Sequence, residues 1–182
     1  MAKKLKISLL PHEQELLKQG ILTETTHKGA SARWLSLPDK YHTINEMAIL
    51  TNSNPENKIL VYRHMSDREF SYLRENNQLP DTQPYQTIVC GDPGFKYCMK
   101  YFTGQKKVAT NVTTIVQFLA DKKLIDELFE MHAKSEDGCM SHGLGDKGGK
   151  GLPIFNKAME HGDITWVVRL VKRPEKMKNY RF

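Results

Sequence analysis

Long apolar runs are missing from this sequence. None of its 182 residues belongs to an apolar stretch approaching the roughly 20 residues that a membrane-spanning helix needs. The start, residues 1–6, is rich in lysine and lacks the apolar core of a secretory signal. The sequence therefore predicts no contact with a membrane and favours the cytoplasm, and it leaves delivery into another cell open.

Paired metal-binding or disulfide-forming motifs are also missing. The three cysteines, Cys90, Cys98 and Cys139, are odd in number and include no CxxC pair. The seven histidines show neither HxH nor HxxxH spacing. This argues against a disulfide framework and against a zinc site, and it favours a reducing compartment. The net charge of +6 permits nucleic acid, a phosphate-bearing cofactor or an acidic partner but requires none of them.

The clearest local pattern covers residues 59–76. The run 59–64 is short, apolar and rich in β-branched and aromatic residues, which predicts a buried strand. Ser66 and Glu69 have the spacing of a capping box, with Met65 and Phe70 at the positions of a hydrophobic staple. We therefore expect a strand that ends near residue 64 and a helix over 67–76.

Two basic side chains stand at the end of this predicted strand. Because side chains alternate along a strand, Arg63 and His64 lie on opposite faces. The N-terminus of the following helix offers free N–H groups and the positive end of a dipole. Together these groups suit an anion such as phosphate or pyrophosphate. The structural alternative is that Arg63 pairs with a carboxylate and that His64 caps the edge of the sheet.

The remaining elements follow from periodicity and from turn residues. Residues 23–57 are broken by polar residues and predict only short strands and turns. Residues 108–119 read as a strand with one polar face, open to solvent or to a ligand. Residues 163–171 are apolar on both faces and predict a central strand. Further elements are expected as helices at 11–20, 95–102, 121–134 and 153–162, and as a strand at 85–90.

These elements predict one α+β domain with a central, mostly antiparallel sheet flanked by short helices. Residues 1–58 would form a helical or irregular N-terminal segment, 59–171 the core, and 172–182 a basic tail. A glycine-dense stretch at 138–151 precedes the last helix. It matches neither a Walker loop nor a dinucleotide fingerprint, and it predicts a lid, an anion-binding loop or an ordinary connection.

The order of motifs resembles the ADP-ribosyltransferase family, especially its toxin-like branch. The resemblance rests on aromatic-Arg-His-x-Ser at the end of a strand, on a helix of the form Asp-x-Glu-Phe-x-x-Leu, and on a later Thr-Asn-x-Thr-Thr stretch. It covers residues 59–171. It implies an ADP-ribosyltransferase-like fold and a mono-ADP-ribosyltransferase that uses NAD as its substrate.

The resemblance also implies roles for particular residues. Arg63 or His64 would hold NAD, and Glu160 or Glu136 would be the carboxylate that stabilises the oxocarbenium-like ribose. The Glu-x-Glu or Gln-x-Glu that the family carries before the last strand is absent here. Further cofactor contacts would come from a hydroxyl and amide set and from two aromatic rings: Ser66, Thr110, Asn111, Thr113, Tyr97 and Tyr101.

Two other functions fit the same residues. In a basic ribonuclease-type toxin domain, His64 or His142 and a lysine of the glycine loop, Lys147 or Lys150, would carry out acid-base chemistry on RNA. A non-enzymatic domain would use the same basic surface only for binding. The leading hypothesis is a toxin or effector that consumes NAD and modifies a protein or nucleic acid.

Overall fold

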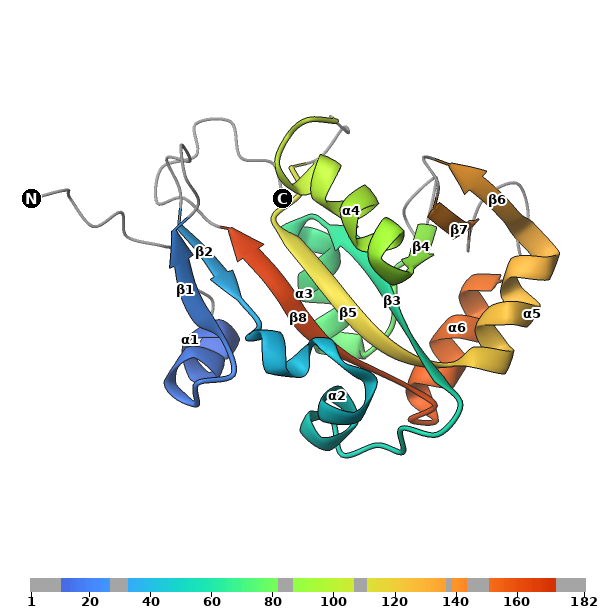
Figure 1. Cartoon of the computed structure of the whole chain (residues 1–182), viewed down its shortest axis with the longest axis horizontal. Helices are drawn as coiled ribbons and strands as arrows, with labels where there is room; N and C mark the ends of the chain where they lie inside the picture. Colours follow the sequence, from blue (N-terminus) through green and yellow to red (C-terminus); the bar gives the residue numbers. More distant parts are fainter. Residues whose placement is uncertain are drawn as a thin grey trace, which may run out of the picture.

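The computed structural model describes residues 11–26, 33–81, 87–106, 111–136, 139–143 and 151–172. One eight-stranded sheet in the order β1-β2-β8-β5-β3-β4-β7-β6 runs through it, and every neighbouring pair is antiparallel. The fold is thus α+β with an antiparallel sheet, as predicted (Figure 1). Its strands are β1 Thr23–Thr26, β2 Arg33–Ser36, β3 Lys58–Met65, β4 Thr87–Cys90, β5 Thr114–Asp121, β6 Ala133–Glu136, β7 Cys139–Gly143 and β8 Ile164–Lys172.

Helices cover both faces of the sheet. Figure 1 shows α4 and α2 in front of the central strands and α3 behind them. Among the described helices, none has the length and apolar character needed to cross a membrane. The helices are α1 Pro11–Lys18, α2 Ile44–Leu50, α3 Asp67–Asn76, α4 Gly91–Phe102, α5 Lys122–His132 and α6 Gly151–Glu160, with a 3-10 turn, η1, at Asp39–His42.

The two faces of β3 lie in different surroundings. Val61 and Met65 point to the rear face, into an aliphatic core shared with α3, α5 and α6. Tyr62 points to the front face, into an aromatic cluster with α4. His64 shares the parity of Tyr62, so the histidine also faces α4. The alternation predicted from the sequence therefore separates Arg63 and His64 onto the rear and front faces.

The junction between β3 and α3 confirms the sequence pattern. The helix spans Asp67–Asn76 as predicted, and Ser66 Oγ accepts from the N–H of Glu69 at 3.3 Å. Met65 and Phe70 are both buried in the core. The carboxylate of Glu69 differs from the predicted capping box, because it binds the guanidinium of Arg63. The β8 strand is central as predicted, between β2 and β5.

Several predicted boundaries need correction. The strand expected over 108–119 begins at Thr114, and its polar face is not open: Thr113 and Gln117 are buried and Asn111 is half-buried, because helices cover both sides of the sheet. The helix expected at 95 begins at Gly91, and the one expected at 153 begins at Gly151. Strand β7 runs through the start of the glycine-dense stretch.

A helix went unpredicted within 23–57. Thr43 accepts from the N–H of Glu46 and caps α2, so a Thr-x-x-Glu box was present in the sequence. Other predictions lie outside the described residues. These are the lysine-rich start at 1–6, the basic tail beyond Lys172, Thr110, and the glycine-dense stretch around Lys147 and Lys150.

Candidate functional site

Arg63 is engaged in a buried ion pair on the rear face. Its side chain is 5% exposed, its Nε donates to Glu69 Oε1 at 2.5 Å, and its Nη1 donates to the carbonyl of Thr87 at 2.9 Å. This is the carboxylate pairing that the sequence left open as the structural alternative. The pair fastens β3 to α3 and β4, and it leaves the guanidinium turned away from the front face.

His64 lies in an aromatic cluster with α4. Its ring stacks on that of Tyr101, with centroids 4.2 Å apart and an interplanar angle of 7°. Tyr97 lies 6.1 Å from His64, and its hydroxyl is 3.4 Å from that of Tyr101. Lys106 Nζ lies within 6 Å of both tyrosine rings. The structure thus brings together three of the predicted site residues.

The imidazole of His64 is neutral near physiological pH. Burial, and to a smaller extent the nearby positive charge of Arg63, together lower its pKa to about 3. Its Nδ1 is fully enclosed and has no hydrogen-bond partner within the described parts of the chain. His64 therefore combines one N–H donor with one acceptor and carries no charge.

The predicted hydroxyl set belongs to the start of α3. Ser66 caps that helix, and Thr113 Oγ1 donates to Asp67 Oδ1 at 2.5 Å. Asn111 is half-buried, just ahead of β5. Ser66 and Thr113 thus hold the junction directly after His64.

Of the two carboxylates that the resemblance implies, the structure describes the side chain of Glu160 alone. Glu160 is exposed in the last turn of α6. That helix packs on the rear aliphatic core through Phe155 and Met159, so Glu160 does not join His64. Glu136 ends β6, and its side chain lies outside the described part of the structure. His142 pairs through its backbone with Ile88 and Ala133, and its side chain is likewise not described.

A second polar cluster, which the sequence did not predict, lies on the front face at Arg169. In the pairing of β5 with β8, Ile115 opposes Leu170 and Val116 opposes Val168, so Arg169 is the extra residue of a β-bulge. Its carbonyl accepts instead from the N–H of Leu37 at 2.9 Å.

Two aromatic rings and one amide side chain surround the guanidinium of Arg169. Its Nη1 donates to Gln117 Oε1 at 2.7 Å, and its Cζ lies 4.5 Å from the centroid of Phe95 and 5.9 Å from that of Tyr62. Gln117 is itself fixed by donating to the carbonyl of Tyr41 at 3.0 Å. Burial lowers the pKa of Arg169 and raises that of Tyr62.

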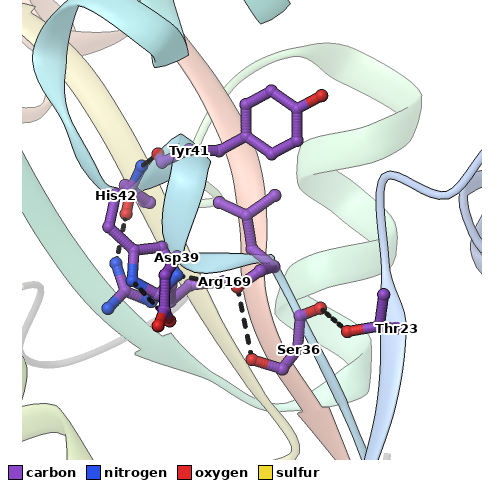
Figure 2. Close-up of polar contacts among 8 residues, drawn as sticks. Thr23, Ser36, Asp39, Tyr41, His42 and Arg169 are labelled. Carbon is purple, nitrogen blue, oxygen red and sulfur yellow. Dashed lines mark hydrogen bonds and ion pairs between the residues drawn. The ribbon is translucent and has the colours of Figure 1, made fainter.

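His42 lies next to Arg169 at the end of η1. Figure 2 shows its side chain gathered with those of Asp39 and Arg169. Its Nε2 is 2.7 Å from the carbonyl of Leu37, and its Nδ1 is 3.5 Å from Asp39 Oδ1. Burial and then the charge of Arg169 lower the pKa of His42. The neutral ring therefore donates Nε2–H to Leu37 and keeps a lone pair on Nδ1.

One signal in the sequence pointed to this cluster. An arginine within a strand that is otherwise apolar on both faces requires a specific partner, because a buried charge is otherwise too costly. The partners themselves come from four separate segments and leave no joint pattern in the sequence.

Comparisons of the chain with protein-family models, with curated proteins and with solved structures gave no match. Within the described residues, no group of three or more His, Cys, Asp or Glu side chains is placed to hold a metal ion. The argument for function therefore rests on the geometry of the front face.

Proposed function

We propose that this chain is an ADP-ribosyltransferase-like enzyme, acting as a toxin or effector, that binds NAD on the front face of the sheet. The observation that carries the proposal is the parallel stack of His64 on Tyr101 at the end of β3. Aromatic rings arranged in this way are suited to contact with a nicotinamide or adenine ring. The resemblance of residues 59–171 to that family supports the same assignment.

The charge state of His64 suits this chemistry. Cleavage of the glycosidic bond of NAD builds positive charge on the ribose. A protonated histidine beside that ribose would oppose the charge, whereas the neutral ring of His64, with its lowered pKa, can hydrogen-bond a hydroxyl without opposing it. For the carboxylate, Glu136 takes precedence over Glu160, because Glu160 projects from a helix on the rear face.

The ribonuclease alternative loses one of its candidates. A general acid or base on RNA should titrate near the working pH. With a pKa of about 3, His64 does not meet that condition. That function would rest on His142 and on the lysines of the glycine loop.

The test is NAD binding and turnover in matched tyrosine variants. Tyr101→Ala removes half of the stack, and Tyr72→Ala removes an exposed tyrosine of α3 that lies outside the cluster. We expect Tyr101→Ala to reduce NAD hydrolysis by about fivefold or more, since stacking contributes roughly 1 kcal/mol beyond buried area, and Tyr72→Ala to retain the parental rate. Absence of both NAD binding and NAD hydrolysis in the parent protein would refute the proposal.

A further inference from the structure

Arg169 is a half-buried cation without a carboxylate partner. Within the described residues, no Asp or Glu oxygen lies within 4.0 Å of its guanidinium, whereas the other buried arginine of the sheet, Arg63, binds Glu69 directly. Asp39 and Asp92 act on Arg169 only by attraction at longer range. Burying a charge without a paired ion is unfavourable, so this arrangement leaves Arg169 with unused capacity to bind an anion.

The guanidinium is also held in one orientation. The ring of Phe95, 4.5 Å from Cζ, and the hydrogen bond from Nη1 to Gln117 Oε1 restrict its movement from two sides. On the described part of the front face, the guanidinium of Arg169 has one other hydrogen-bond partner besides Gln117, the hydroxyl of Tyr62. A guanidinium carries more N–H donors than these two groups can accept. The remaining donors form a rigid fork that loses little entropy when an oxyanion binds.

The bulge leaves this arginine without a pairing partner on β5, while alternation from Val168 in the rear core puts its side chain on the front face. A regular ladder would pair residue 169 with β5. As the extra residue of the bulge, Arg169 is released from that pairing, and its carbonyl bonds to Leu37 in the segment that leads into η1. Bulges commonly re-aim a side chain beside a functional site. The same bond positions His42 next to the guanidinium.

We propose that Arg169, framed by Phe95, Gln117 and Tyr62, is a binding site for the phosphate group of a small ligand. A phosphate offers two oxygens to the guanidinium fork and supplies the direct anionic contact that Asp39 and Asp92, at longer range, do not. The inference goes beyond the proposed NAD chemistry, because it depends on the surroundings of Arg169 and not on the stack of His64 with Tyr101.

The test uses inorganic pyrophosphate as the probe, at constant ionic strength, with binding measured by calorimetry. The variants are Arg169→Lys, which keeps the charge but loses the fork, and Arg169→Gln, which loses both. Arg68→Gln is the matched control, because Arg68 is exposed on α3 behind the sheet. We expect affinity to fall by about tenfold or more in Arg169→Lys and further in Arg169→Gln, with Arg68→Gln equal to the parent.

A second measurement needs no variant and is unaffected if Arg169→Gln fails to fold. Proton NMR titration of the parent should show that pyrophosphate raises the pKa of His42, because the bound anion offsets the charge of Arg169 that lowers it. The groups that face His42 are Arg169, Asp39 and the carbonyl of Leu37.

Parental affinity in Arg169→Gln, or pyrophosphate binding that leaves the pKa of His42 unshifted, would overturn the proposal. An equal response to acetate would overturn the assignment to phosphate. None of these measurements uses NAD turnover, so the phosphate site can be refuted without refuting the NAD chemistry, and the reverse.

Discussion

Two arginines of the same sheet, Arg63 and Arg169, have opposite surroundings. On the rear face, Arg63 is enclosed by an aliphatic core and bound to both a carboxylate and a carbonyl. On the front face, Arg169 lies between an aromatic ring and an amide and has no carboxylate within 4.0 Å in the described parts of the chain. The first arrangement satisfies the charge internally, whereas the second leaves the charge available to a ligand.

The difference shows why burial alone does not identify a functional residue. Arg63 is the more buried of the two, yet its partners account for its position as a link between β3, α3 and β4. The front face instead collects groups whose hydrogen-bonding capacity is not used up, namely Arg169 and the Nδ1 of His64. Function is therefore better sought where polar groups are held but not satisfied.

The largest expected effect concerns the buried ion pair between Arg63 and Glu69. Glu69→Ala leaves the guanidinium of Arg63 buried without its carboxylate, and it should lower the free energy of unfolding by about 3–5 kcal/mol. Glu75→Ala, an exposed position on the same helix, is the control and should change stability little. Urea unfolding measures both. A loss of less than about 1 kcal/mol in Glu69→Ala would remove the contrast drawn between the two arginines.

The second prediction concerns pH and the front face. The pKa of His64 is about 3 in the folded protein and near 6.5 when unfolded, so the unfolded chain gains a proton first as pH falls. The free energy of unfolding should therefore fall between pH 6.5 and pH 4, by about 1 kcal/mol per pH unit. His64→Phe should abolish this component, whereas His161→Phe, at an exposed position, should retain it. Equal pH slopes in the parent and in His64→Phe would mean that the ring is not held neutral.

The smallest expected effect concerns the helix cap at the junction between β3 and α3. Ser66→Ala should cost about 1 kcal/mol, because the N–H of Glu69 loses its acceptor. Ser71→Ala, in the middle of α3, removes a hydroxyl that caps nothing and serves as the control. Thermal unfolding of the two variants gives the comparison. If Ser66→Ala matched Ser71→Ala, the cap would not contribute to holding the junction.

The junction was predictable because its determinants are local. The strand at 59–64, the cap at Ser66 and the extent of α3 all follow from interactions between residues a few positions apart. The cap of α2 by Thr43 was equally local, and its box was present in the sequence. The prediction missed it because the surrounding polar residues obscured the helical period.

The front-face site was less predictable because its determinants lie far apart in the chain. Whether Arg63 or Arg169 is paired depends on which carboxylate each one meets after folding, and side-chain alternation says nothing about that. The bulge that frees Arg169 is a property of the β5–β8 register, which the sequence of β8 alone does not specify. Gln117 and Phe95 reach the same guanidinium from separate segments.

The contacts at the two ends of α4 also bear on how well ordered the front face is before a ligand binds. Near its start, a Cβ on Gly94 would meet the backbone carbon of Val89 at 2.8 Å, so the helix lies directly against β4. At its end, the carbonyl of Phe102 accepts from Lys172 Nζ of β8. A helix fastened at both ends holds Tyr101 against His64. The stacked rings are therefore ordered before a ligand arrives, and a ligand that binds there has less conformational entropy to offset.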